Sequence, residues 1–247
     1  MLGIRDSNVK VVTDQLRIYY DAGQLRSYSG SGVSIFNLAG ISDTGTLTNG
    51  PTFNSSNGGS IVFDRTDDYL VSTSQSNINL SPSTGYTIGS WVYPEFTAAD
   101  FTEQIAAPIA QRGNPTDQSD VHFRLALGYN SFGMGAIRGI VWGYDAFNSF
   151  GFIGTTNRWT NNAWNYIVTA HSGSSVKMWV NGSHIGTLTG RASYDRNNAN
   201  HRYTVSVQTT NINNRYRGRM SITHAYNKQL TDAEVLQNYN AVKSRYI

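Results

Sequence analysis

The sequence predicts an all-β protein with one α-helix near its C-terminus, on three observations. Residues 164–190 alternate apolar with polar residues at a period of two, as half-buried strands do, and so predict three antiparallel strands. Asn181-Gly182 separates the last two of these strands, and both residues tolerate the positive φ of a hairpin turn. A helical spacing of apolar residues stands out in one stretch only, after residue 230.

Other runs of β-branched and aromatic residues, bounded by turn residues, predict the remaining strands. Residues 1–14 are expected to be an N-terminal arm, and residues 15–247 a single domain, because no linker or repeat divides them. The predicted strands cover 16–20, 60–63, 69–71, 84–93, 121–127, 203–209 and 219–225, with two or three more in 128–154.

A capping box predicts the start of the helix. Thr231 precedes Glu234 by three residues, so each side chain can hydrogen-bond the backbone amide of the other. The apolar residues that follow recur at helical spacing: Val235, Leu236, Tyr239 and Val242. One apolar stripe needs one apolar surface, so the helix is expected to lie against a sheet.

Composition excludes several classes of function. The net charge is only +3, and no basic run accompanies it, so nucleic-acid binding is not expected. No stretch approaches the ~20 apolar residues of a membrane span, which argues against membrane insertion. The chain has no cysteine, which excludes disulfides and thiolate metal sites. The first residues lack the apolar core of a secretory signal.

Several stretches together carry a family resemblance. They include IYYDAGQLRSYSGSG (18–32), GTLTNGPTF (45–53), GGSIVFDRTDDYL (58–70), YTIGSWVYP (86–94), the hairpins of 164–190, and residues 216–246. The set resembles the concanavalin A-like lectin/glucanase superfamily, in its laminin-G/pentraxin-like branch, and is similar to single-domain proteins common in tailed bacteriophages. The resemblance implies a two-sheet antiparallel jelly roll over residues 15–247, with glycans on the concave face or its rim loops.

The same resemblance implies a non-enzymatic virion structural protein, either a capsid decoration or a fibre-associated module, with glycan adhesion as an accompanying activity. Its partners would be other virion proteins and cell-surface glycans. It would be made in the host cytoplasm, reside in the virion and form a homo-oligomer. Two alternatives stay open: a freestanding carbohydrate-binding lectin, and a glycoside hydrolase or lyase.

The carboxylates argue against an enzyme. Glycoside hydrolysis needs two carboxylates flanking the bond, and glucanases of this superfamily carry them as Glu-x-Asp-x-x-Glu on one strand. The chain lacks that run and has only three glutamates: Glu95, Glu103 and Glu234. The single dense group is Asp64, Asp67 and Asp68, which we interpret as turn residues between two strands, with a cation or acid–base site as the alternative.

No cofactor is expected, with calcium as the one candidate. The resemblance places a ligand pair at Asp117 and Asp120, in a loop for which a solvated polar surface is the alternative. The segment 208–211, where pentraxins carry an acidic run, is neutral here, which argues against a double-calcium site. The five histidines show no metal-ligand spacing.

Aromatic residues supply the candidate glycan site. Exposed rings stack on sugars while amides and carboxylates bond the hydroxyls. The candidates are Trp142, Tyr144, Asp145, Phe147 and Trp159. Trp142 and Tyr144 share strand parity and hence a face. The alternative is that these rings fill the space between the two sheets, and the sequence does not decide which face is buried.

Overall fold

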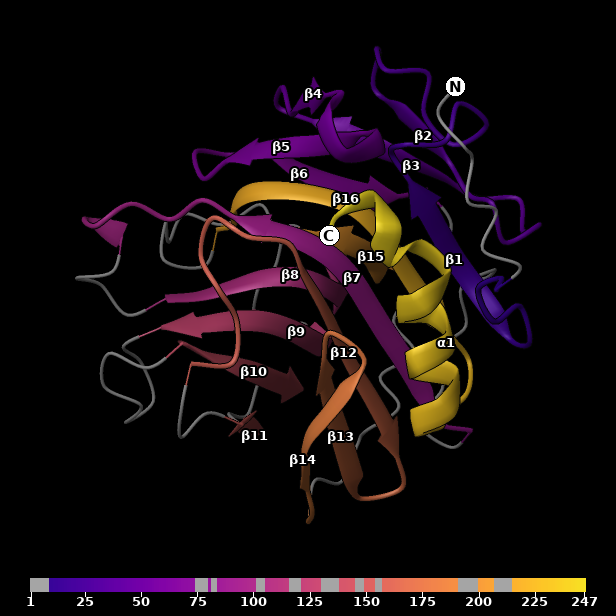
Figure 1. Cartoon of the computed structure of the whole chain (residues 1–247), viewed down its shortest axis with the longest axis vertical. Helices are drawn as coiled ribbons and strands as arrows, with labels where there is room; N and C mark the ends of the chain where they lie inside the picture. The colour runs from indigo at the N-terminus through magenta and orange to yellow at the C-terminus, as the bar shows by residue number, and fades with distance from the viewer. Residues whose placement is uncertain are drawn as a thin grey trace.

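A computed structural model describes most of the chain as two antiparallel sheets packed face to face (Figure 1). The described residues are 9–73, 80, 84–100, 105–115, 121–129, 138–144, 149–153, 157–190, 200–206 and 215–247. Of these, residues 105–106, 122, 129, 138–144 and 149–153 are described by their backbone alone.

The first sheet, sheet A, carries the hairpins predicted from residues 164–190. Asn181 and Gly182 form the turn between β13 and β14 with φ of 51° and 79°, as the sequence predicts. The order across the sheet is β14 (Ser183–Leu188), β13 (Ser175–Val180), β12 (Asn165–Ser172), β7 (Tyr86–Pro94), β16 (Arg217–Tyr226), β5 (Ser60–Asp64) and β4 (Thr52–Asn54), and β1 (Leu16–Asp21) pairs with β16.

The second sheet, sheet B, holds the other strands. Their order is β11 (Ser149–Ile153), β10 (Arg138–Tyr144), β9 (Val121–Tyr129), β8 (Ile105–Gly113), β15 (Arg202–Val205), β6 (Tyr69–Ser72), β3 (Thr44–Thr48) and β2 (Ser34–Phe36). Every strand pair among the described residues is antiparallel, so the predicted all-β jelly-roll sandwich is confirmed.

The main core lies between the sheets and follows from the period of two. On β9, Phe123, Leu125 and Leu127 are fully buried there, and on β12 Ile167 is buried opposite them. Alternation puts the neighbouring residues on the outer faces.

A second apolar cluster covers the outer face of sheet A. It lies beneath α1 (Asp232–Val242) and η4 (Lys243–Arg245), which cross that sheet in Figure 1; a further short turn, η1 (Ser56–Gly58), precedes β5. Trp91 stacks on Tyr239 and Tyr246 with ring centroids 5.5 and 4.2 Å away. The predicted capping box is present, with the Glu234 amide donating to Thr231 Oγ1 at 3.3 Å.

The described part of the N-terminal arm, residues 9–14, packs on its own domain without forming a strand. The Val12 amide donates to Asn238 Oδ1 at 2.7 Å, and the Tyr226 hydroxyl donates to the Val12 carbonyl at 3.0 Å. The Val12 side chain joins the apolar cluster beneath α1. No described helix has both the length and the apolar character needed to cross a bilayer.

Candidate functional site

The structure describes only part of the predicted glycan site. Asp145 and Phe147 lie outside the described residues, as do the predicted calcium ligands Asp117 and Asp120. Trp142 and Tyr144 belong to β10, whose side chains are not described. The backbone register sets Trp142 opposite Leu125, whose own side chain is buried between the sheets.

Trp159 is a core residue, as the alternative interpretation predicts. Its side chain is 2% exposed and belongs to the cluster between the sheets, with its ring 5.9 Å from that of Phe96. A ring so enclosed offers no face to a sugar, so Trp159 is not part of a surface platform.

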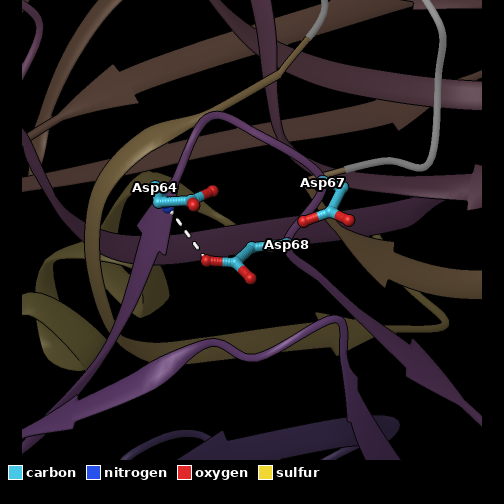
Figure 2. Close-up of side chains that lie close together, drawn as sticks. All are labelled: Asp64, Asp67 and Asp68. Carbon is cyan, nitrogen blue, oxygen red and sulfur yellow. Dashed lines mark hydrogen bonds between the residues drawn. The ribbon is translucent and has the colours of Figure 1, made fainter.

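The aspartate cluster occupies the turn between β5 and β6 (Figure 2). Asp64 Oδ1 accepts from the Thr66 amide at 2.6 Å, and Asp68 Oδ2 accepts from the Asp64 amide at 3.0 Å. These bonds hold a turn in which Arg65 has a φ of 69°, so the predicted role as turn residues is present in the structure.

The same cluster has an unusual charge distribution. Carboxylate oxygens of all three aspartates lie within 4.8 Å of one another. Burial raises the pKa of Asp68 to about 6, and the charges of Asp64 and Asp67 add to this against the hydrogen bond from the Asp64 amide. Burial also acts on Asp64, but hydrogen bonds from Thr66 and Asp67 outweigh it and lower its pKa. With one oxygen from each aspartate, the cluster would supply three of the six to eight oxygens that calcium takes.

The two described glutamates are engaged in structural contacts. Glu95 receives Arg219 Nη2 at 2.5 Å and Arg219 Nε at 3.2 Å. Glu234 caps α1 and accepts from Lys228 Nζ at 2.7 Å. The carboxylate beside Glu234 is that of Asp14, and Lys228 Nζ lies between the two, donating to Asp14 Oδ2 at 2.8 Å, so both are held by the lysine charge.

A cavity beneath α1 is too small for a saccharide. It is lined by Trp91, Tyr166, His224, Tyr226 and Asn238, among others. Its open volume is about 10 Å³, close to that of a single water molecule. Two pairs of side chains that line it are joined by hydrogen bonds: Tyr166 Oη lies 2.7 Å from His224 Nε2, and Asn238 Nδ2 donates to Tyr226 Oη at 3.0 Å.

A surface patch at the end of β7 was not predicted from the sequence. Tyr93 is half-buried, and Arg219 lies over its ring with Cζ 4.6 Å from the centroid. The carboxylate of Glu95 accepts hydrogen bonds from the same guanidinium. Because 124 positions separate Glu95 from Arg219, no local motif marks the pair. Only the pairing of β7 with β16 brings them together.

The family model of the concanavalin A-like lectin/glucanases superfamily matches residues 64–236, well over half of the chain. No curated protein sequence matches significantly.

Three solved structures illustrate the structural likeness. The binding domain of Paraclostridial Mosquitocidal Protein 1 superposes with a TM-score of 0.67 at 17% identity, over 93% of this chain and 52% of that one. Domain 4 of a GH43 extracellular arabinanase from Geobacillus stearothermophilus, solved in complex with arabinotriose, has a TM-score of 0.62 at 15% identity, over 91% and 98%. The botulinum neurotoxin type G receptor binding domain has a TM-score of 0.62 at 13% identity, over 92% and 51%. This chain thus spans about half the length of the two toxin domains.

Proposed function

The chain belongs to the concanavalin A-like lectin/glucanase superfamily, and on that premise we propose that it is a non-catalytic carbohydrate-binding domain. The observation that carries the proposal is the match to the arabinanase domain. That domain corresponds to this chain along nearly the whole length of both, and it was solved with an oligosaccharide bound. The toxin neighbours are binding domains too, although only half of each corresponds.

The engagement of the glutamates supports a binding role over hydrolysis. A general acid must keep a carboxyl ready to give up a proton, whereas Glu95 is held by a guanidinium and Glu234 by a helix terminus and a lysine. The hydrolase alternative would need turnover of a polysaccharide that is lost when Glu95, Asp64 or Asp145 is replaced.

The virion setting stays a prediction from the sequence resemblance. It covers the structural role in a capsid or fibre, the virion partners, the homo-oligomer and the location in the virion. The arm of residues 1–14, with its three valines Val9, Val11 and Val12, would be the docking element, and a particle-binding assay of the chain with residues 1–14 deleted would test it. Unchanged particle binding after this deletion would argue against docking through the arm.

The sequence-predicted site residues also stay predictions. Trp142, Tyr144, Asp145 and Phe147 remain candidates for glycan contact, and Asp117 and Asp120 for a single calcium ion. Each is tested by an alanine variant of the residue, compared with the native protein for sugar binding and for thermal stability.

A glycan-array screen of the purified protein, run with and without a chelator, tests the proposed function. A hit that free sugar competes away is the expected result. Sensitivity to the chelator would favour calcium at Asp117 and Asp120. A blank array in both conditions, from protein shown to be folded by circular dichroism, would overturn the proposal.

A further inference from the structure

On the outer face of sheet A, the exposure of the side chains increases along β7. Trp91 is enclosed by Tyr239 of α1 and by Tyr246 near the chain's end, and it is 1% exposed. Tyr93, two residues further along the same face, is only half-buried. The patch therefore begins where the cover of α1 and η4 ends.

Strand pairing builds the patch around Tyr93. Arg219 on β16 pairs directly with Tyr93, and directly paired residues share a face. On the other side, Trp164 precedes β12 and meets Tyr93 edge-on, with ring centroids 5.5 Å apart and planes at 64°. The backbone positions of these three residues are thus set by the sheet.

The polar part of the patch is a bidentate ion pair between Arg219 and Glu95. Arg219 gives Nη2 and Nε to the two oxygens of Glu95, at 2.5 and 3.2 Å, which leaves Nη1 for another acceptor. The side chains of Arg219 and Glu95 are 23% and 30% exposed. An ion pair this exposed stabilises a fold by about 0–1 kcal/mol, so stability alone gives little reason for it.

Two further polar residues lie beside this patch. Asn162 is exposed, and its amide donates to the Pro94 carbonyl at 2.8 Å, which ties its turn to the end of β7 beside Tyr93 and Glu95. The Trp164 indole N–H, in a side chain 8% exposed, has no hydrogen-bond partner among the described residues.

We propose that Tyr93, Arg219, Glu95 and Asn162 form a subsite for a neutral saccharide, an inference that rests on the proposed function. A sugar presents an apolar C–H face and a rim of hydroxyls that both donate and accept. The guanidinium lies on the Tyr93 ring and presents its outer plane and the exposed edge of the ring as the apolar surface, Glu95 accepts from hydroxyls, and Arg219 and Asn162 donate to them. Glu95 already balances the charge of Arg219, so a sugar carboxylate would find no net positive charge to attract it here.

Binding of array oligosaccharides by matched variants tests the subsite. Neutral and uronic-acid oligosaccharides are compared as probes, with arabinotriose among the neutral ones. Glu95→Gln keeps the shape of the side chain but removes its charge, and Tyr93→Ala removes the ring. Each is expected to weaken binding of the neutral probe at least tenfold. Phe36→Ala is the control, because Phe36 is an exposed ring (54%) on β2 of the other sheet.

The outcomes separate the two proposals. Binding that survives in both variants, or a preference for uronic-acid probes, overturns the subsite and leaves the carbohydrate-binding function standing. A blank array with the folded native protein overturns both. Thermal melts accompany each variant, and Glu95→Gln gives the decisive reading if Tyr93→Ala melts early.

Discussion

Arg245 donates to Asp21 from both terminal guanidinium nitrogens, Nη1 to Oδ2 at 2.8 Å and Nη2 to Oδ1 at 2.9 Å. The pair joins the last turn of the chain to its first core strand. Asp21 is fully buried, whereas the Arg245 side chain keeps 22% of its surface. Beside them, Tyr246 Oη donates to Ser221 Oγ at 2.8 Å, so the chain's end is fastened at two points.

Arg245→Ala is expected to lower the free energy of unfolding by about 3 kcal/mol, because it leaves a buried carboxylate without its ion-pair partner. Lys228→Ala is the matched control. Lys228 likewise makes two bonds to carboxylate oxygens, one each to Asp14 and Glu234, but Asp14 is largely exposed and the expected loss is below about 1 kcal/mol. Urea unfolding measures both, and equal losses would contradict the account of the buried pair.

Stability should depend on pH through His224. Burial lowers the pKa of His224 to about 3, whereas an unfolded histidine titrates near 6.5. Between these values the unfolded chain binds the proton and the folded chain does not. The contribution of His224 to stability is therefore complete above pH 6.5 and falls towards pH 3, by up to about 1.4 kcal/mol per pH unit.

The comparison of His224→Gln with the native protein isolates this contribution. Glutamine does not titrate and can still bond the Tyr166 hydroxyl, which lies 2.7 Å from His224 Nε2. The slope of stability against pH should be shallower in the variant between pH 3 and 6.5. The exposed His184, replaced by glutamine, serves as control. Identical slopes in His224→Gln and the native protein would argue against a buried neutral imidazole.

Asp68 should act in the opposite sense. Burial raises its pKa to about 6, so the folded chain holds the proton at pH values where the unfolded chain, near 3.8, has lost it. This contribution to stability is present below pH 3.8 and is lost as the pH rises to about 6. At pH 7 the charged carboxylate is a cost to the fold.

Asp68→Asn is therefore expected to stabilise the protein at pH 7 by about 1 kcal/mol, and to leave it unchanged near pH 3.5. Asparagine keeps an oxygen for the Asp64 amide and removes the repulsion within the turn. Thermal melts at both pH values make the measurement. Asp67→Asn is the comparison, because it removes one repelling charge from an exposed position and should therefore stabilise the protein less than Asp68→Asn does. Destabilisation by Asp68→Asn at pH 7 would indicate that the charge is used, as in a cation site.

The elements that the sequence predicted well are those fixed by local chemistry. Asn181-Gly182 forms its turn because only a few residues tolerate those φ values, and Thr231 with Glu234 caps α1 because both partners lie within one helical turn. Such signals do not depend on what packs against them.

Faces and distant pairs could not be predicted in this way. Period-two alternation groups residues without saying which group is buried. Trp159 lies outside the strands, where no alternation applies, so it fitted a platform as well as the core that it occupies. A register shift between Met220 and Ile222 also changes the parity of β16, placing Arg219 and Ile222 on the same face of sheet A. The position of such a bulge cannot be predicted from alternation, because the bulge itself interrupts the period of two.

A row of polar residues lies on the outer face of sheet B. Thr204 pairs with Gln111, which pairs with Arg124, so the three residues share one face. Arg124 Nε donates to Gln111 Oε1 at 2.9 Å. Thr204 Oγ1 and Gln111 Nε2 are fully buried and have no hydrogen-bond partner within the described parts of the chain.

Thr204→Val is expected to raise the free energy of unfolding by about 1 kcal/mol, because it replaces a buried, unsatisfied hydroxyl with a methyl group of the same shape. Thr223→Val is the contrasting variant. Thr223 Oγ1 lies 2.9 Å from Ser90 Oγ and also bonds the Tyr203 hydroxyl, so its loss should cost about 1–2 kcal/mol. Urea unfolding of both compares them directly. A loss of stability in Thr204→Val would mean that its hydroxyl is satisfied in solution, by a buried water or by a bound hydroxyl group.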